Sequence, residues 1–261
     1  MIDLDLETVK CEVIEDHIAV VRLDNPPVNA HSAQMLGDIP AMMDRLSDLD
    51  QIRAVVLTGQ GRVFCAGADI KEPSGGAREA GDHWRTSRAA RETYHSVREC
   101  QKPVVAAING AALGGGLAIA ASCDILVASE VGHLGLPEID VGLLGGQRHA
   151  MRLFSHSRLR LMALTGQRIF GPELYRSGVV EACVPVEELM EAALTIARSL
   201  ASKSPIAMPM AKGSLNAIEE MTLRDGYRYE QNLTGELRQT EDSREAMRAF
   251  IERRPPVFKG R

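Results

Sequence analysis

Three consecutive glycines, Gly114 to Gly116, constrain this chain more than any other feature of its sequence. They follow a β-type run, residues 103–108, and precede a small and apolar segment, residues 117–122. Glycines between a strand and a helix let the backbone approach a ligand closely, because no Cβ intervenes. They also leave free N–H groups at a helix start, where the helix dipole favours negative charge. The turn suits an oxygen that gains negative charge, although a turn with glycines chosen only for packing fits equally well.

A second turn of small residues, Phe64 to Asp69, follows another strand-like run, Arg53 to Gly59. Two such turns can each offer one backbone N–H to the same oxygen. They would then form an oxyanion hole, in which one donor is commonly worth about 10²–10³ in rate. The sequence therefore predicts a site built largely from backbone atoms.

Composition favours a globular enzyme with one large core. The chain has 261 residues, 45% of them hydrophobic, which is enough for one α/β domain. A formal net charge of −5 argues against a nucleic-acid partner and against a basic membrane patch. The longest uncharged stretch, residues 103–123, is interrupted by Asn109 and its glycines, so it predicts buried core rather than a membrane span.

Cysteines and histidines give no sign of a metal centre. The five cysteines lack CxxC spacing, and the seven histidines are scattered without an HExxH pattern. An odd number of cysteines is typical of reduced thiols, and no charged-then-apolar leader pattern opens the sequence. We therefore expect a cytoplasmic protein. No GxxxxGK[ST] loop and no flavin or pyridoxal signature occurs, so no bound cofactor is implied.

Helices are predicted by apolar spacing along much of the remaining chain. The clearest run is residues 35–49, with Pro40 expected in an early turn or at a kink. Further helices are expected at 157–164, 172–177 and 187–201, with two more between 205 and 237. Asp242 and Glu245 have the spacing of a capping box before a last helix.

The two turns, together with later motifs, resemble the crotonase superfamily, which is the enoyl-CoA hydratase/isomerase family. The resemblance runs from about Val9 to the C-terminus, and the matching motifs are Cys65 to Ile70, Asn109 to Gly116, Cys123 to Ile125, Gly135 to Glu138 and the pair Phe258-Lys259. It implies an α/β fold, a crotonase-like spiral of repeated β-β-α units over residues 1–200. A C-terminal helical region over residues 201–261, within the same domain, would trimerise.

The resemblance also implies acyl-CoA chemistry through a thioester enolate. The backbone N–H groups of Ala68 and Gly115 would bind the thioester oxygen. Consecutive prolines keep the corner at residues 25–30 extended, and its Pro27 and Val28 would contact CoA through backbone groups. The other expected CoA contacts are Ala66, Asp69, Ile70, Lys71, Phe258 and Lys259.

Two further expectations follow from the resemblance. Phe258 and Lys259 would lie against a CoA that often belongs to a neighbouring subunit, with Lys259 near a phosphate. The assembly would be a homotrimer or a dimer of trimers. CoA enters as part of the acyl-CoA substrate, so no separate cofactor is expected.

Glu138 is the side chain that we expect to move a proton. It follows Pro137 among apolar neighbours, so burial should raise the pKa of its carboxyl group. A raised pKa suits a group that takes and returns one proton near neutral pH. Without the resemblance, a solvated glutamate at a strand end would be the simpler interpretation.

The chain departs from the hydratase pattern at Ala118. Two-carboxylate hydratases carry a first glutamate two residues beyond the glycine triplet, and alanine can neither activate water nor deliver a proton. The Gly-x-x-Pro-Gly-x-Gly-Gly stretch of the family is also shorter here, at residues 142–146, which reshapes the pocket wall beside Glu138. One carboxylate and an oxyanion hole are sufficient for moving a double bond.

We therefore expect a Δ3,Δ2-enoyl-CoA isomerase, with an enoyl-CoA hydratase, or a lyase or hydrolase of the same family, as alternatives. A non-catalytic acyl-CoA-binding protein is the alternative from another class. In the variable wall over the acyl pocket, Trp84 either contacts substrate or packs on a surface helix. Asp140 would share a strand face with Glu138. The other candidates for a second acid or base are His31, His133, Arg148 and His149.

Overall fold

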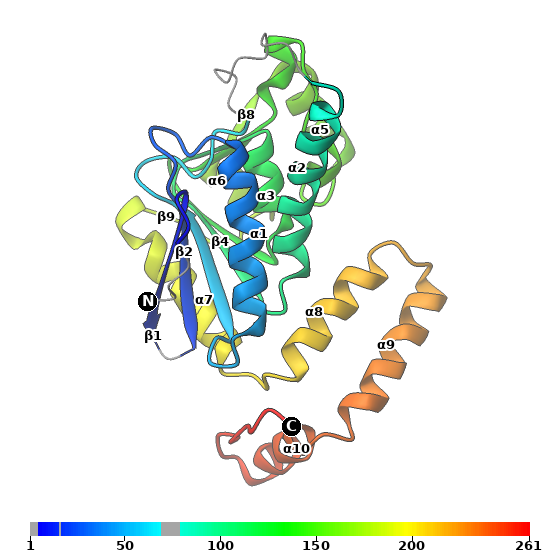
Figure 1. The fold of residues 1–261 in the computed structure, drawn as a ribbon. Helices are drawn as coiled ribbons and strands as arrows, with labels where there is room; N and C mark the ends of the chain where they lie inside the picture. Colours follow the sequence, from blue (N-terminus) through cyan, green and yellow to red (C-terminus); the bar gives the residue numbers. More distant parts are fainter. Residues whose placement is uncertain (1–4, 16, 69–78) are drawn as a thin grey trace.

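The centre of the fold is a six-stranded sheet in the order β1-β2-β3-β4-β6-β9 (Figure 1). The computed structural model describes residues 5–15, 17–68 and 79–261. β1 and β2 pair antiparallel, and the later strands of this sheet pair parallel. The strands are β1 Val9–Glu15, β2 Ile18–Leu23, β3 Ala54–Gly59, β4 Val104–Ile108, β6 Ile125–Ser129 and β9 Cys183–Val184.

Helices cover both faces of this sheet, which is why β3 and β4 are buried along their whole length and are apolar except for Thr58. On one face, α1 (Ala33–Asp48) packs its methionines and leucines against alternate strand residues. On the other face, α7 (Leu189–Ala201) packs against the intervening residues. The hydroxyl of Ser32 caps α1 by accepting from the N–H of Met35 at 3.2 Å. Pro40 lies in the interior of α1 and not in its first turn.

A second, three-stranded sheet holds the glycine triplet in place. Its strands are β5 (Ala111–Leu113), β7 (His133–Gly135) and β8 (Arg168–Phe170), in the order β5-β7-β8. β5 follows β4 after only Asn109 and Gly110. The amide of Asn109 donates to the carbonyls of Gly59 (3.0 Å) and Gly61 (2.9 Å), which fastens the end of β4 to the end of β3.

The helices predicted at 157–164, at 172–177, within 205–237 and near the C-terminus are present, with ends that differ by a few residues, whereas those at 137–141 and 147–150 were not predicted. The predicted continuous helix at 187–201 is instead a short 3₁₀ helix followed by α7. The elements are α2 Asp82–Glu99, α3 Gly115–Ser122, η1 Pro137–Val141, α4 Gln147–Ala150, α5 His156–Thr165, α6 Gly171–Arg176, η2 Val186–Glu188, α8 Ala207–Ile218, α9 Leu223–Leu237 and α10 Glu241–Glu252.

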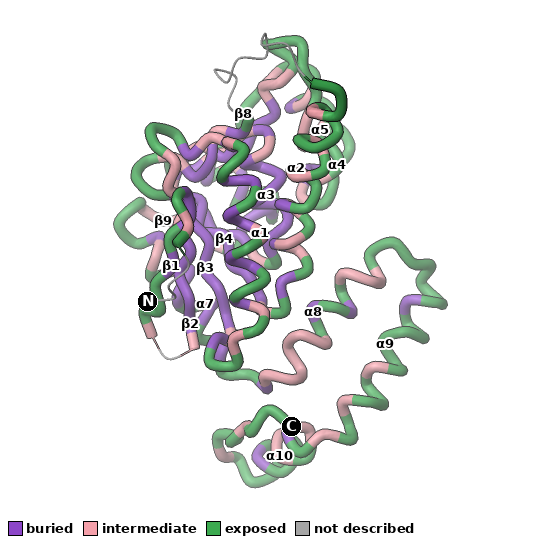
Figure 2. Tube along the Cα trace, viewed as in Figure 1, coloured by how far each residue is buried: buried purple, intermediate pink, exposed green. Residues whose placement is uncertain are grey.

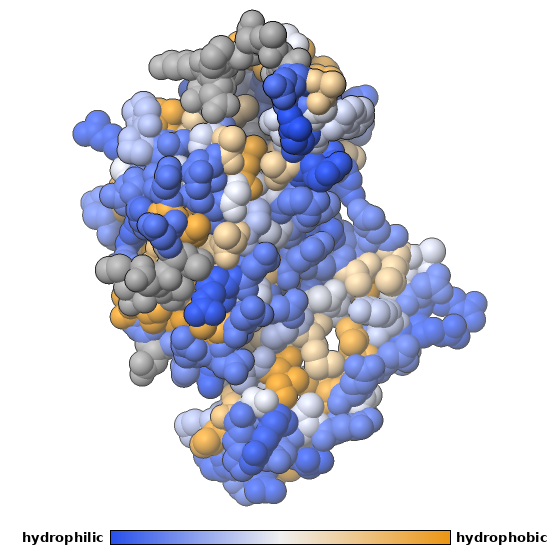
Figure 3. Space-filling view, viewed as in Figure 1, coloured by the Kyte–Doolittle hydropathy of each residue, from blue (hydrophilic) through white to orange (hydrophobic). Residues whose placement is uncertain are grey.

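Helices α8 to α10, here called the C-terminal arm, extend away from the sheet (Figure 1). Most of the arm is exposed or half-buried, whereas the sheet and α3 are buried (Figure 2). Lys212 is one of the residues that join the arm to the core: its Nζ lies 2.8 Å from Asp124 Oδ2 and donates to the carbonyls of Val97 and Lys102. Arg98 also donates to the carbonyl of Asn216. Apolar side chains remain on the surface of the arm (Figure 3), among them Leu223, Phe250 and Ile251.

The capping box predicted at Asp242 and Glu245 is wrong. Thr240 caps α10 by accepting from the N–H of Ser243 at 3.1 Å. The buried carboxylate of Asp242 instead accepts from the Ser204 hydroxyl (2.8 Å) and from the N–H of Lys259 (2.7 Å). The backbone N–H groups of the tail thus bind the carboxylate of Asp242, and this holds the tail against α10.

Two absences apply to the described residues only. No helix among them is long and apolar enough to cross a membrane. No three or more of their histidines, cysteines and acidic residues are grouped so that they could hold a metal ion.

Candidate active site

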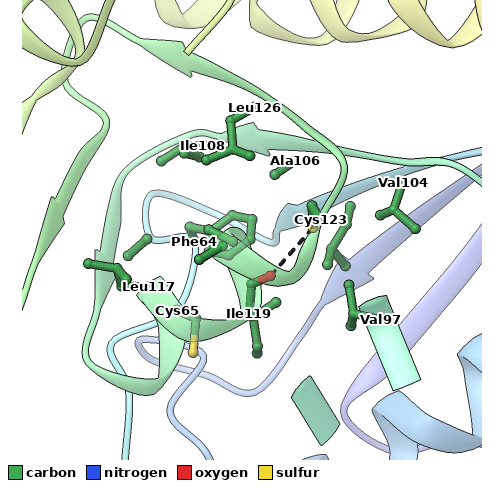
Figure 4. Close-up of a cluster of buried hydrophobic side chains, with 14 of the residues drawn as sticks. Phe64, Cys65, Val97, Val104, Ala106, Ile108, Leu117, Ile119, Cys123 and Leu126 are labelled. Carbon is green, nitrogen blue, oxygen red and sulfur yellow. Dashed lines mark hydrogen bonds between the residues drawn. The ribbon is translucent and has the colours of Figure 1, made fainter. Parts of the chain in front are cut away.

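The two small-residue turns predicted from the sequence lie side by side. The N–H of Cys65 donates to the carbonyl of Ala111, and the N–H of Leu113 donates to the carbonyl of Cys65, both at 3.0 Å. The first turn therefore pairs with β5 just before the glycine triplet. Figure 4 shows Phe64, Cys65 and Leu117 in one buried apolar cluster, which anchors both turns to the core.

The closeness of the turns requires glycine. A Cβ added to Gly67 would lie 2.6 Å from the carbonyl oxygen of Leu113 and 3.3 Å from the nitrogen of Gly115. Gly67 also has a φ of +87°, which favours glycine. A Cβ on Gly116 would overlap the carbonyl oxygen of Cys65. The glycines thus serve close packing as well as leaving backbone N–H groups accessible.

Ala68 and Gly115, the predicted oxyanion donors, both lie where the first turn meets the glycine triplet, which is here called the junction. Gly115 opens α3, and Ala68 directly follows Gly67, whose α-carbon faces the Gly115 nitrogen. Among the described residues, the N–H groups of Ala68 and Gly115 donate to no protein acceptor. A carbonyl oxygen placed between them would therefore find two uncommitted donors.

Glu138 projects its carboxylate onto the same junction. It lies in η1, after Pro137, and its Oε1 contacts the α-carbon of Gly114. On another side, a Cβ added to Gly145 would lie 2.9 Å from Oε1. Burial raises the pKa of the Glu138 carboxyl group, and Oε2 is buried without a hydrogen-bond partner in the described structure. The carboxylate is thus held by packing and by its own backbone N–H, and Oε2 has no partner among the described residues.

His31 and Tyr94 lie on the Gly115 side of the junction. A Cβ added to Gly115 would lie 2.6 Å from His31 Nδ1 and 2.9 Å from Tyr94 Oη. The Tyr94 ring contacts the ring of His149 edge to face, with 4.9 Å between centroids. Sequence reasoning named His31 and His149 among several equal candidates and did not assign Tyr94 to the site. The available signal was helical spacing, because buried Thr93 and Val97 mark the inner face of α2 next to Tyr94.

Asp140 does not lie beside Glu138. Residues 137–141 form a 3₁₀ helix instead of continuing β7, and residues two apart in such a helix point to different sides. The Asp140 carboxylate lies against Gly166, at the end of α5. The prediction that Asp140 shares a strand face with Glu138, and could act there as a second acid, is therefore wrong.

The other charged candidates lie elsewhere. His133 Nδ1 bonds the carbonyl of Val131 at 3.0 Å, and its ring stacks near Phe170. Arg148 pairs with Glu220 on the surface at 3.0 Å. Both are engaged in structural contacts.

Comparison with known proteins identifies the family. Over residues 13–261 the chain matches the family described as Enoyl-CoA hydratase/isomerase. It is 35% identical to the mitochondrial enoyl-CoA hydratase of Pongo abelii over 246 residues, which cover 93% of this chain and 83% of the relative. The chain belongs to this family.

Solved structures of similar proteins confirm the crotonase fold. The enoyl-CoA hydratase of Bacillus anthracis superposes with a TM-score of 0.92 at 32% identity, covering 98% of this chain and all (100%) of that one. DspI of Pseudomonas aeruginosa also gives 0.92, at 30% identity and 99% coverage of both chains. The protein is thus an acyl-CoA enzyme of the enoyl-CoA hydratase/isomerase family.

Within this crotonase fold, the corner predicted to contact CoA adjoins the first turn. The N–H of Ala66 donates to the carbonyl of Val28 at 3.1 Å, which brings Pro27, Val28 and Ala66 together. Asp69, Ile70 and Lys71 lie outside the described residues.

Phe258 and Lys259 belong to the tail that follows α10, away from α3 of the same chain (Figure 1). The backbone of Lys259 is held by Asp242, and its Nζ lies 3.6 Å from Glu241. The tail therefore does not reach the junction of its own chain. This absence of contact is compatible with the expectation that the tail lies against the CoA of a neighbouring subunit.

The structure also places Trp84 and Ala118. Trp84 is 66% exposed on α2, where its ring contacts that of the adjacent His83. Ala118 is fully buried (0% exposed) in α3 and offers only a methyl group where the hydratase pattern has a glutamate.

Proposed function

We propose that this member of the family is a Δ3,Δ2-enoyl-CoA isomerase that uses one carboxylate. The observation that carries the proposal is the position of Glu138, which is the only carboxylate that the described structure brings against the glycine junction. Ala118 offers no second one. Moving a double bond needs only one group that takes and returns a proton.

The reaction would start with the carboxylate form of Glu138. The carboxylate removes a proton from C2 of a 3-enoyl thioester, and the C–H electron pair forms a dienolate whose charge develops on the thioester oxygen. The N–H groups of Ala68 and Gly115 would stabilise that oxygen, as donors aimed at developing charge do. Glu138 then returns the proton to C4, which leaves the double bond between C2 and C3.

The surroundings of Glu138 support both halves of this cycle. A carboxylate removed from water is a stronger base than one in solution, because burial disfavours its charged form. The unpartnered Oε2 leaves an oxygen atom available for the proton. Such proton transfer by a positioned side chain typically contributes about 10²–10⁴ in rate.

We further propose that CoA is bound by the corner at Pro27 and Val28, by residues 66 and 69–71, and by Phe258 and Lys259 of a neighbouring copy. No cofactor besides the CoA of the substrate is proposed. We also propose that the protein is cytoplasmic, which suits its five free cysteines.

The exposed apolar side chains of the arm support a homotrimer or a dimer of trimers. Phe250 is 86% exposed and Ile251 79% exposed on α10, although both are large and apolar. Analytical ultracentrifugation of Phe250→Glu should show dissociation into smaller species, because a charge would be buried between copies. An unchanged mass would place Phe250 outside the interface.

The isomerase proposal is tested with 3-enoyl-CoA in D₂O, followed by mass spectrometry. We expect deuterated 2-enoyl-CoA from the native protein, since a proton held on Glu138 can exchange with solvent before it returns. Glu138→Gln should lower the rate by about 10²–10⁴ and retain binding of the CoA ester. Near-normal turnover in this variant contradicts the proposal. Ester binding by the native protein without product or exchange supports the non-catalytic alternative.

A further inference from the structure

His31 touches both of the turns that meet at the junction. Its backbone N–H donates to the carbonyl of Gly67 at 2.7 Å, and its backbone pairs with that of Ala68 as a parallel bridge. Its imidazole ring lies against the α-carbon of Gly115, where an added Cβ would lie 2.6 Å from Nδ1 and would also overlap Cε1. One residue outside both turns therefore connects the surroundings of the two predicted oxyanion donors.

The backbone of His31 is fixed from both sides. Asn29, two residues earlier, donates its amide to the carbonyls of Gln60 (3.0 Å) and Val63 (2.8 Å), which ties the corner to the segment before the first turn. Ser32, the next residue, caps α1. The ring is thus attached to a backbone that cannot shift without breaking these bonds, as a side chain that positions a site requires.

The ring is also confined by other rings. The centroid of the Tyr94 ring lies 6.1 Å from that of His31, and the Tyr94 ring in turn packs edge to face on His149, at 4.9 Å. Tyr94 Oη lies near the same side of Gly115, because a Cβ added there would lie 2.9 Å from it. Three rings, from the segment before α1, from α2 and from α4, therefore gather beside α3 and limit the positions open to the imidazole.

Core packing alone does not account for a histidine at this position. His31 is only 7% exposed, and its Nε2 is buried without a hydrogen-bond partner among the described residues. Burial lowers the pKa of His31 to about 4, so the ring is uncharged near neutral pH. A polar atom buried without a partner costs stability, and an aliphatic side chain of similar size would avoid that cost. The imidazole offers instead a short planar ring, which needs less room against Gly115 than a branched side chain.

We propose that His31 is a positioning residue of the oxyanion hole. Its backbone holds the turn that carries Ala68, and its ring sets how closely the start of α3, which carries the N–H of Gly115, approaches that turn. The two N–H groups are thereby kept at a spacing that lets both bind one oxygen, about 2.7–3.1 Å from each donor. The inference rests on the proposed function, because it assigns the thioester oxygen to the same two N–H groups.

The test observes the thioester carbonyl itself. Butyryl-CoA labelled with ¹³C at this carbonyl has no double bond to move, so its infrared difference spectrum can be recorded on the native protein without isomerisation. We expect a lower stretching frequency in the bound ester than in the free one, because two preorganised donors polarise the carbonyl more strongly than water does. His31→Ala removes the ring but keeps the backbone bond to Gly67, and it should lose most of this lowering.

The kinetics of the same variant give a second readout. His31→Ala should lower kcat for isomerisation of 3-enoyl-CoA by about 10², the loss expected when a group is misplaced by about 1 Å. Its Kd for butyryl-CoA should stay within about threefold of the native value, because the interaction that is lost strengthens mainly in the transition state.

Two more variants separate positioning from stability. His31→Leu fills the space with a branched chain and buries no unpaired nitrogen, so it should be at least as stable as the native protein and still lose part of the lowering. Leu46→Ala is the matched control, because Leu46 is fully buried in the core near the other end of α1. Its cavity should reduce thermal stability without changing the carbonyl frequency.

The outcomes distinguish this inference from the proposed function. A native carbonyl frequency in folded His31→Ala or His31→Leu overturns the inference and leaves the proposed function standing. An equal change in Leu46→Ala also overturns the inference, since lost stability would then explain the change. No lowering with the native protein removes the oxyanion hole, and with it both the inference and the isomerase mechanism. A lowering that depends on His31, in a native protein that does not isomerise 3-enoyl-CoA, supports the inference and overturns the proposed function.

Discussion

The glycines of the candidate site and those of the C-terminal arm are the same residue in opposite surroundings. At Gly116, in the junction, a Cβ would overlap the carbonyl oxygen of Cys65. At Gly213 and Gly235, within α8 and α9, a Cβ would meet nothing within 4 Å. In the junction a Cβ on Gly67 or Gly116 would meet backbone atoms, and a Cβ on Gly114 or Gly115 would meet the side chains that line the site. In the arm the backbone only carries side chains.

The two regions also differ in what remains unsatisfied. At the junction the groups without a hydrogen-bond partner among the described residues are polar: the backbone N–H groups of Ala68 and Gly115, Glu138 Oε2 and His31 Nε2. On the arm the largest exposed side chains are apolar, with Leu223 (92%) and Phe250 (86%) almost fully exposed, although the buried Ser214 hydroxyl also has no partner among the described residues. Unpaired polar groups in a buried place suit a small polar ligand, whereas exposed apolar groups on helices suit another protein surface. Substitutions should therefore damage chemistry in the first region and association in the second.

Among the substitutions that compare these two regions, the largest effect is expected for Gly67→Ala. The added methyl group would lie 2.6 Å from the carbonyl oxygen of Leu113, so the two turns must separate. We expect isomerisation to fall by about 10²–10³, the effect of losing one oxyanion donor. The measurement is the steady-state rate together with a thermal unfolding curve.

Gly61→Ala is the matched control for backbone strain. Gly61 also has a positive φ, +76°, but a Cβ there would meet nothing within 4 Å. Its isomerisation rate should stay within about threefold of the native rate, because only conformational strain of order 1 kcal/mol is added. Equal losses in both variants would show that positive φ, and not the contact between the turns, explains the defect.

Lys212→Met tests the joint between the two regions and should have the next largest effect. Lys212 is only 6% exposed, and its loss removes the cation beside Asp124, which keeps only the N–H of Val104 as a donor among the described residues, and a donor to two backbone carbonyls. Breaking a buried pair from one side destabilises a protein by about 3–5 kcal/mol, and we expect about 3 because Asp124 is 25% exposed. The free energy of unfolding in urea measures this loss.

The comparison variant is Arg148→Met, which removes a pair that is exposed on both sides. Such pairs contribute about 0–1 kcal/mol. A loss in Lys212→Met no larger than that in Arg148→Met would show that the arm is held to the core by other contacts.

The rate of isomerisation should also depend on pH, and this change is expected to be smaller than those above. Glu138 must begin as a carboxylate, and burial raises its pKa above the ordinary value of 4.5. The rate should therefore increase with pH up to this raised pKa and level off above it, falling about tenfold per pH unit on the acid side. A pH profile of kcat/KM measures it, and a midpoint at or below 4.5 would contradict the burial argument.

Much of the junction could be predicted from the sequence, because its signals are local. Small residues after a buried apolar run predict a tight turn wherever it lies, and Glu138 follows a proline among apolar neighbours. The positions of Asp140 and Tyr94 depend instead on how distant segments pack. Asp140 was misplaced because η1 replaces the strand, and nothing in residues 137–141 alone fixes that choice.

The arm also contains a feature that the local sequence could not predict. The spacing of Asp242 and Glu245 matches a capping box, but their carboxylates bind the tail and Arg254. Thr240, two positions earlier, caps α10 instead, because threonine is also a favoured N-cap residue. Competition between equivalent local partners is settled by the rest of the fold, so the short pattern could not predict the outcome.

The smallest effect is expected for Gly213→Ala, the counterpart of Gly67→Ala in the arm. Gly213 lies inside α8 with open space at its Cβ position, so alanine adds no overlap. Alanine is favoured over glycine within a helix by about 0.5–1 kcal/mol, and we expect a gain in unfolding free energy of that size with activity unchanged. If Gly213→Ala instead destabilises the protein, and does so more at high protein concentration than at low, then a second copy packs against α8 at this glycine. In that case a glycine of the arm, like those of the junction, would allow a close approach, but between two copies of the chain. The two regions would then differ less in what their glycines do.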